Sequence, residues 1–363
     1  MSYHSLKRAL AACLVPALVL AAAACESTDG AVSDFHVDTL DAAPDTADDT
    51  IADLMPDMPV DTPVDAAPDP VPDAPPDRVE EDTGADTTAD PVDDDGSGAV
   101  CYTEPVYPDA DLSDLEAWYS GSNYLETEFE ALSRRWPAGY DLLDAMRGDP
   151  YLGTFTDTTS FATVMESLMT EVHEETHGWD YEHASWGSTF AYYVRADLTY
   201  TTTWVDGFPR SEIRAMLADD STDLYEFYLQ GEQGTYGFVE LLDEMNCYIN
   251  GMAGIAYVGD TIEGWGISGI DGAVAFMYYL ELYLKRARTM YADLYISIKG
   301  EAAFVDMIRT QWLRLHFFLQ QADRFPLLGI HDDAIRVHMY NTDNQSEIEM
   351  LIDHPVAASN CLP

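Results

Sequence analysis

Apolar side chains between residues 101 and 363 recur mainly three and four positions apart, which is the spacing of one face of an α-helix. Glycines and prolines separate the segments that show this spacing. We predict helices over residues 112–147, 159–178, 223–255, 271–296, 301–321 and 345–353. Residues 191–204 (AYYVRADLTYTTTW) differ, because they are rich in aromatic and β-branched side chains, which is typical of strands. The predicted fold class is therefore mainly α with a small β element (α+β) and a helical C-terminal part.

The composition changes abruptly before residue 101. Residues 26–100 contain 23 acidic side chains, one basic side chain and ten prolines. Such a segment cannot bury enough apolar surface to fold, and proline and like-charge repulsion keep it extended. We predict a disordered Asp/Pro-rich tether over residues 25–100 and one folded domain over residues 101–363.

The N-terminus has the pattern of an export signal. Lys7 and Arg8 precede an apolar run, Ala9–Leu20, and small residues follow it up to Cys25. This resembles a bacterial lipoprotein signal, in which cleavage leaves the cysteine as the lipidated first residue. The resemblance implies a signal peptide over residues 1–24, a lipid on Cys25 that anchors the chain in a membrane, and an extracytoplasmic place in the cell envelope, at the outer membrane or cell surface. An ordinary secretory signal, cut after the alanines, is the alternative.

Charge narrows the possible partners. The formal net charge is −49 at pH 7, and acidic residues also outnumber basic ones in the predicted domain. This argues against binding nucleic acid or anionic lipid through general electrostatics. A calcium-dependent module is also disfavoured, because residues 109–120 (DADLSDLEAWYS) lack the loop glycine and the final glutamate of an EF-hand.

Three cysteines lie in the predicted domain. Cys101 and Cys361 are at its two ends, and the termini of a domain are often close together. We therefore predict a disulfide between them, as suits an exported protein. Cys247 falls within an apolar helical pattern and is predicted to be a buried, inert thiol, with a role as a zinc ligand as the alternative.

The densest group of candidate metal ligands is the sequence HEETHGWDYEH, which begins at His173. His173 and His177 are four positions apart, so on a helix they lie on the same face, one turn apart. The preceding residues have helical spacing, with Thr159 or Ser160 as N-cap, and both histidines fall at the border of the apolar stripe. Two imidazoles at this spacing can bind two corners of a tetrahedral zinc ion while Glu174 reaches a metal-bound water.

This HExxH spacing resembles that of the zincin metallopeptidases. The resemblance implies a zincin-like metallohydrolase domain with Zn²⁺ as cofactor, His173 and His177 as ligands, and Glu174 as the general base toward a zinc-bound water. It also implies a peptide or protein substrate. With the lipoprotein signal, the sequence indicates a lipid-anchored extracytoplasmic zinc metallopeptidase. The alternative is a non-catalytic surface binding lipoprotein on a zincin-like scaffold, whose metal is structural or lost.

Two residues are candidates for the third ligand. His183 lies six positions after His177, as in the metzincin pattern HExxHxxGxxH, but Asp180 occupies the position of the metzincin glycine. Glu244 lies in a later predicted helix, an arrangement that resembles the gluzincins. We favour Glu244 slightly, because aspartate turns out of a helix less freely than glycine.

Polar neighbours of Glu244 suggest further roles. Asp243 and Asn246 are candidates to hold the N–H groups of the ligand histidines. Tyr248, one turn beyond Glu244, is a candidate to donate a hydrogen bond to a developing oxyanion.

Overall fold

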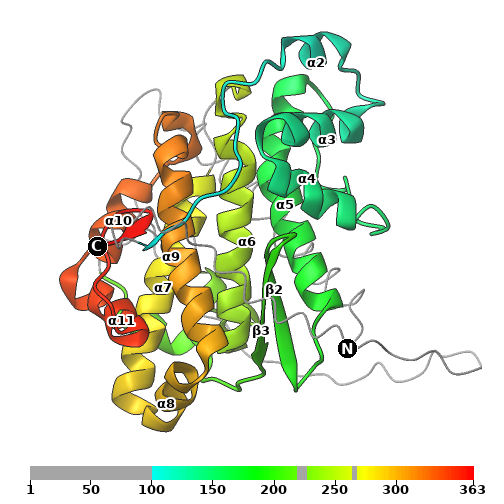
Figure 1. Cartoon of the computed structure of the whole chain (residues 1–363). Helices are drawn as coiled ribbons and strands as arrows, with labels where there is room; N and C mark the ends of the chain where they lie inside the picture. Colours follow the sequence, from blue (N-terminus) through cyan, green and yellow to red (C-terminus); the bar gives the residue numbers. More distant parts are fainter. Residues whose placement is uncertain (1–99, 219–226, 264–267) are drawn as a thin grey trace, which may run out of the picture. The chain divides into compact units, whose positions relative to one another are not determined.

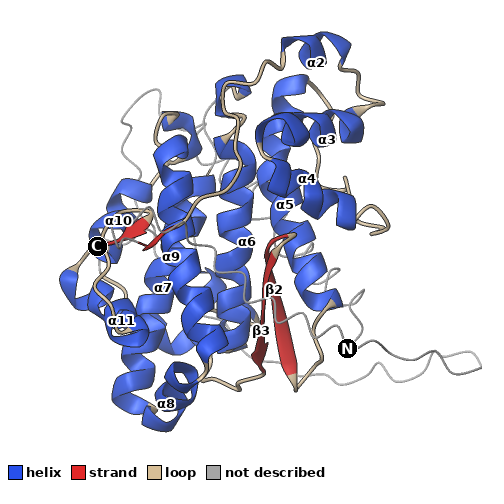
Figure 2. Cartoon of the chain, in the orientation of Figure 1, coloured by secondary structure: helices blue, strands red, loops and turns tan. Residues whose placement is uncertain are grey.

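The computed structural model describes residues 100–218, 227–263 and 268–363. The predicted signal peptide and, apart from Val100, the predicted tether lie outside the described residues. The described part is mainly helical, with two small two-stranded sheets (Figure 2). This confirms the predicted fold class.

The helices and strands follow the order of the chain. The helices are α2 (Ser113–Trp118), α3 (Tyr124–Arg135), α4 (Pro137–Ala145), α5 (Phe161–Glu182), α6 (Phe238–Ala256), α7 (Gly269–Met290), α8 (Ala292–Gly300), α9 (Ala302–Ala322), α10 (Asp332–Met339) and α11 (Thr342–Ile352). The strands are β1 (Val100–Cys101), β2 (Thr189–Arg195), β3 (Leu198–Thr203) and β4 (Cys361–Leu362). Short 3₁₀ turns connect some of them, including Arg210–Met216 and Gln233–Thr235.

Helix α6 is the centre of the core. It packs against α5, α7 and α9, and Figure 1 shows it between α5 and α9. Every residue of α6 except Glu240 is buried. Four of these buried side chains are polar: Asp243, Glu244, Asn246 and Asn250. Because a buried polar group is costly unless it is paired, each of the four needs a partner inside the protein.

Helix α5 begins where its capping residue predicts. The Ser160 side chain accepts a hydrogen bond from the Thr163 backbone N–H, and the Thr163 hydroxyl accepts one from the Ser160 backbone N–H. The helix continues to Glu182, beyond the predicted end at residue 178. Both motif histidines therefore lie in regular helix.

The strands predicted over residues 191–204 form a hairpin. β2 pairs antiparallel with β3, with Tyr192 opposite Tyr200, and β2 packs against α5 and α6. The interior of β2 is buried on both faces, whereas β3 has exposed positions. Helices α4, α5 and α6 all pack against β2.

Several other predicted boundaries differ from the structure. The segment predicted as one helix over residues 112–147 forms α2, α3 and α4, with Pro137 at the start of α4, and the segment predicted over residues 271–296 is divided between α7 and α8.

The helix predicted over residues 223–255 begins only at Phe238, and its first residues lie outside the described part. Gly231 adopts a positive φ of 54°, a conformation that does not belong to a regular helix. Helix α10 was not predicted, although its sequence is amphipathic: the buried Ile335 and Met339 are four positions apart, on one face of the helix.

The two ends of the predicted domain meet. β1 pairs antiparallel with β4, and a disulfide joins Cys101 to Cys361, which confirms the predicted bond. In the part of the chain that the structure describes, no helix combines the length and the apolar character needed to cross a membrane.

Candidate metal centre

The contact between α5 and α6 brings His173 and His177 to Glu244. The Nε2 atoms of the two histidines are 3.2 Å apart, and Glu244 Oε2 lies 3.8 Å from His173 Nε2 and 3.5 Å from His177 Nε2. Ligand atoms that bind one tetrahedral metal ion with bonds of ~2.0–2.1 Å are separated by ~3.3 Å. The three atoms therefore have the spacing of three corners of one metal site.

The burial of these atoms supports the same interpretation. His173 and His177 are each 2% exposed and Glu244 is 3% exposed. Glu244 Oε2 has no hydrogen-bond partner among the described residues, although it faces both imidazoles. A buried carboxylate oxygen without a partner lowers the stability of the fold by about 1–3 kcal/mol, and by more when it is charged. A cation among the three atoms removes that cost, so the residues present fit a metal ion.

The protonation states of His173 and Glu244 also suit a metal. Burial, and then the nearby His177, lower the pKa of His173 to about 3, so this imidazole is neutral at pH 7. Burial raises the pKa of Glu244, but His177 and the Arg210 charge outweigh burial and hold the pKa below its ordinary value. A neutral imidazole and a charged carboxylate are the forms that bind metals.

Asp243 orients His177 from the other side of its ring. Asp243 Oδ2 lies 2.7 Å from His177 Nδ1, so Nδ1 donates to the carboxylate and Nε2 faces His173 and Glu244. Burial lowers the pKa of His177, but the Asp243 charge outweighs burial and raises the pKa well above its usual value. A metal that binds Nε2 must therefore displace a proton. The contact predicted for Asp243 is present.

Asn246 has a different role from the predicted one. Its side-chain amide donates to Asp180 Oδ2 and to the Tyr193 carbonyl, and its oxygen accepts from Gln311. It thus holds Asp180 and β2, and the prediction that it contacts a histidine was wrong.

Asp180, at the position of the metzincin glycine, does not turn the chain. It is fully buried within α5, and its Oδ1 accepts the Tyr193 backbone N–H at 2.6 Å. The helix therefore continues past it to His183, the C-cap residue. The His183 ring is exposed and stacks on the Trp179 ring, with centroids 3.8 Å apart. Its Nδ1 lies 2.8 Å from the Trp179 carbonyl oxygen. His183 is not part of the metal group, by which we mean His173, His177 and Glu244. The structure brings Glu244, and not His183, to the histidine pair.

Glu174 and Tyr248 are each adjacent to His173, Glu174 along the chain and Tyr248 by ring packing. Glu174 follows His173 on α5 and is 1% exposed. The Tyr248 ring packs edge-on against the His173 ring, with centroids 4.4 Å apart. Its hydroxyl shares a 2.7 Å hydrogen bond with the Tyr228 hydroxyl. Tyr248 therefore lies beside the candidate metal centre, with its hydroxyl already engaged.

Sequence reasoning missed Arg210 at this site. Its side chain is fully buried, and its Nη2 lies 3.8 Å from Glu244 Oε1. Its Nε donates to the carbonyls of Tyr228 and Gln233. Arg210 begins a 3₁₀ turn outside any periodic segment, so no local pattern marks it as buried or functional.

A second group of possible ligands shares His177 and Asp243 and adds Cys247. Burial raises the pKa of the Cys247 thiol well above its ordinary value, and the thiol points to Asp243 Oδ1 at 3.8 Å. Asp243 Oδ2 already accepts from His177 Nδ1 at 2.7 Å, so the contacts within this second group engage its members without a metal. The structure thus agrees with the predicted buried thiol, and the group with Glu244 is the better metal site.

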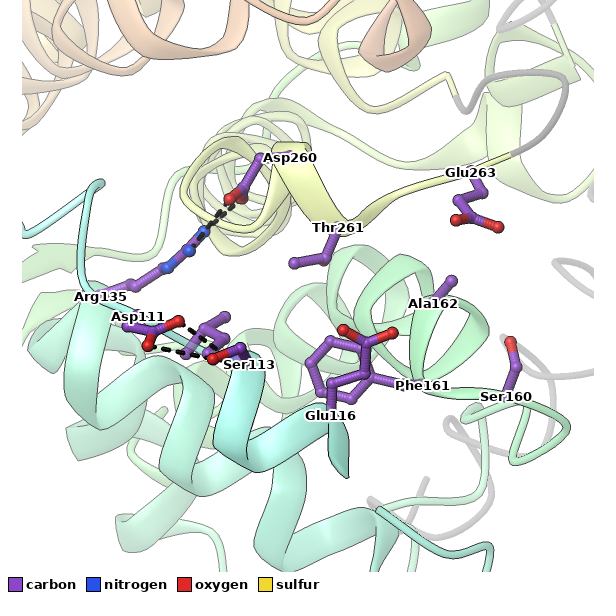
Figure 3. A pocket seen from close by; sticks show the side chains of 11 residues that line it. Asp111, Ser113, Glu116, Arg135, Ser160, Phe161, Ala162, Asp260, Thr261 and Glu263 are labelled. Atoms are coloured by element: carbon purple, nitrogen blue, oxygen red, sulfur yellow. Dashed lines mark hydrogen bonds and ion pairs between the residues drawn. The ribbon is translucent and has the colours of Figure 1, made fainter. Parts of the chain in front are cut away.

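A cavity of about 390 Å³ lies at the other end of α5 (Figure 3). Ser160 and Phe161 line it together with Glu116, and an ion pair between Arg135 and Asp260 borders it. Ser160 precedes His173 by 13 residues, which corresponds to ~20 Å along a helix. This cavity is therefore separate from the candidate metal centre.

Comparison of the chain with protein-family models, with curated proteins and with solved structures finds no match. The arrangement of the side chains themselves is therefore the basis for a functional assignment.

Proposed function

We propose that this protein is a zinc-dependent hydrolase, most simply a metallopeptidase, with His173, His177 and Glu244 as the zinc ligands. The convergence of these three side chains carries the proposal, because it places an HExxH motif on a helix and adds a carboxylate from a second helix. Three protein ligands leave the fourth corner of a tetrahedral site for water or substrate.

The residues around the site have distinct proposed roles. Zinc, when bound, supplies a Lewis acid that polarises a carbonyl group and lowers the pKa of water. Glu174 accepts the proton of the attacking water and passes it to the leaving amine. Asp243 fixes the His177 ring, from 2.7 Å. Tyr248, packed against His173, donates to the developing oxyanion once its hydroxyl leaves Tyr228.

We further propose that the protein works outside the cytoplasm, anchored by a lipid on Cys25 and acting on peptide or protein substrates. The Cys101–Cys361 disulfide supports an oxidising compartment. The net charge of −49 supports a protein that does not bind nucleic acid.

A second candidate function is that of a non-catalytic protein whose metal is structural. The observation in its favour is burial, because the three ligand side chains are at most 3% exposed. Catalytic sites need access for a substrate, whereas structural sites are closed.

Metal analysis tests the site. We expect about one zinc per chain in the purified protein by plasma mass spectrometry. His173→Ala and Glu244→Ala should lose the metal, and His183→Ala, the matched control outside the group, should keep it. Absence of zinc in the parent after incubation with the metal would remove the proposal.

The same preparations separate the two candidate functions. Glu174→Gln should retain zinc but cleave a peptide library roughly 10²–10⁴-fold more slowly than the parent, as read by mass spectrometry. Equal cleavage by the parent and by Glu174→Gln contradicts the role of Glu174. A parent that binds zinc and cleaves nothing favours the structural metal.

A further inference from the structure

Arg210 is held rigidly beside the candidate metal centre. Its Nε donates 2.8 Å hydrogen bonds to the carbonyls of Tyr228 and Gln233, and its Nη2 donates to Gln233 Oε1. These acceptors fix the plane of the guanidinium group. Because Nη2 lies 3.8 Å from Glu244 Oε1, the charge of Arg210 is next to the metal ligand without a direct hydrogen bond to it.

One nitrogen of this group has no acceptor. Nη1 of Arg210 has no hydrogen-bond partner among the described residues, although the side chain is 0% exposed. A buried N–H without an acceptor is unfavourable, and more so on a charged group. Nη1 and Nη2 belong to one planar group, and Nη2 is 3.8 Å from Glu244 Oε1.

The surroundings of Arg210 suit an anionic ligand. The rings of Tyr228 and Tyr236 flank the guanidinium, with centroids 5.2 Å and 5.3 Å from its carbon. They exclude water and so strengthen electrostatic attraction. The chain has only 17 Lys and Arg against 66 Asp and Glu. Arg210 is therefore an uncommon positive charge in an acidic protein, and it lies next to the candidate metal centre.

A carboxylate fits this position better than a phosphate does. Asp243 and Glu244 already place two carboxyl groups close to the site, and both are buried. They oppose a doubly charged ligand more strongly than a singly charged one. A guanidinium N–H binds a carboxylate with a charge-assisted hydrogen bond.

We propose that Arg210 Nη1 binds a carboxylate of the substrate, so that the protein acts on peptides with a carboxylate close to the scissile bond. The carboxylate is the C-terminus of the peptide or an acidic side chain. This inference rests on the proposed metal-dependent hydrolase and adds its substrate class. Because the guanidinium is buried, the ligand reaches Nη1 only when the residues over it move.

Ligand binding tests the inference without requiring turnover. The probes are three hydroxamates, in which the hydroxamate group binds the metal and one amino acid follows it. The first ends in leucine with a free carboxylate, the second in leucinamide, and the third in aspartic acid amide, which has only a side-chain carboxylate. Binding of each to the zinc-loaded full chain is measured by calorimetry.

We expect the leucine acid, the aspartic acid amide or both to bind the parent at least roughly tenfold more tightly than leucinamide, which has no carboxylate. Arg210→Gln should reduce that ratio to within about twofold, and Arg210→Lys should leave an intermediate ratio, because it keeps the charge and loses the planar fork. Tight binding of the aspartic acid amide identifies a side chain as the source of the carboxylate, and weak binding identifies the C-terminus.

Arg314→Gln is the matched control. Arg314 lies on α9, is also 0% exposed, and its nearest carboxylate oxygen is Glu104 Oε2 at 4.0 Å, outside the metal group. This variant should keep the parent ratio, provided that thermal unfolding shows both glutamine variants to be folded.

Several results overturn the inference. Equal binding of all three probes to the parent does so, as does an unchanged ratio in Arg210→Gln or failure of all three probes to bind. If the parent discriminates the probes but cleaves no peptide, the carboxylate site is supported and the hydrolase proposal is contradicted. If the parent binds no zinc, both the hydrolase proposal and the carboxylate inference are contradicted.

Discussion

A single carboxylate determines which nitrogen of His177 is presented to the metal group. Asp243 Oδ2 lies 2.7 Å from Nδ1, and both side chains are buried, so the ring has one favoured orientation. His173 lacks such a partner, since its Nδ1 has no hydrogen bond among the described residues and its ring is instead confined by Tyr248. The two histidines of the candidate metal centre are therefore oriented by different means, one by a hydrogen bond and one by packing.

Asp243→Asn should lower the affinity for zinc about 10–100-fold, because the amide no longer favours the correct tautomer of His177. Competition with a chelator measures the affinity. Asp271→Asn is the control, since Asp271 is likewise fully buried but accepts the backbone N–H groups of Ile330 and His331. Similar losses of affinity in both variants would show that the effect comes from the fold and not from His177.

At the scale of elements, two glycines of α6 allow α5 to approach closely enough for the ligands to meet. A Cβ atom at Gly251 would lie 2.6 Å from the Met169 carbonyl oxygen and 3.3 Å from the His173 Cβ. A Cβ atom at Gly254 would lie 3.1 Å from the Leu168 carbonyl oxygen. The backbone of α5 thus occupies the space that larger side chains on α6 would need, and the distance from Glu244 to the histidines depends on that contact.

Gly251→Ala should force α5 and α6 apart, lower the free energy of unfolding by about 1–3 kcal/mol and weaken zinc binding by roughly tenfold or more. Gly254→Ala should have a smaller effect on both, because its closest contact is longer. Chemical denaturation and chelator competition give the two quantities.

Gly300→Ala serves as the control for this pair. Gly300 ends α8, and a Cβ atom there meets nothing within 4 Å. The variant should be neutral or slightly more stable than the parent. Unchanged zinc affinity in Gly251→Ala would mean that the close helix contact does not set the geometry of the site.

At the scale of the whole molecule, the disulfide joins residues 260 positions apart and holds the two terminal strands together. Beside it, Tyr102 and Trp136 both donate hydrogen bonds to the buried carboxylate of Glu104. The disulfide, the strand pair and these hydrogen bonds therefore hold the first described residues against the core, and none of them involves a residue of the metal group.

Reduction of the disulfide should lower the free energy of unfolding by about 2–4 kcal/mol, because the unfolded chain gains conformational freedom. Zinc content should not change, since neither cysteine contributes to the metal group. Denaturation with and without reductant measures the first, and metal analysis the second. The double variant Cys101→Ser/Cys361→Ser should not respond to reductant, and loss of zinc on reduction of the folded parent would contradict the prediction.

The sequence by itself determined the features that depend on residues close together in the chain. The cap at Ser160, the helical spacing of His173 and His177, and the hairpin of β2 and β3 follow from local hydrogen bonds and local apolar periodicity. The start of α6 at Phe238 is less accessible to such reasoning, because turns ahead of it carry spaced apolar residues that pack against the core without being helical.

Only the tertiary structure decided the membership of the metal group. Glu244 and His183 were both compatible with the sequence, and the choice between them depends on α5 continuing through Asp180 while α6 packs against it. Asn246 and Arg210 gained their roles in the same way, from partners far away in the chain. The physical reason is that a side chain's neighbours across a packed core are set by the simultaneous fit of many elements, which the spacing of residues within one element does not specify.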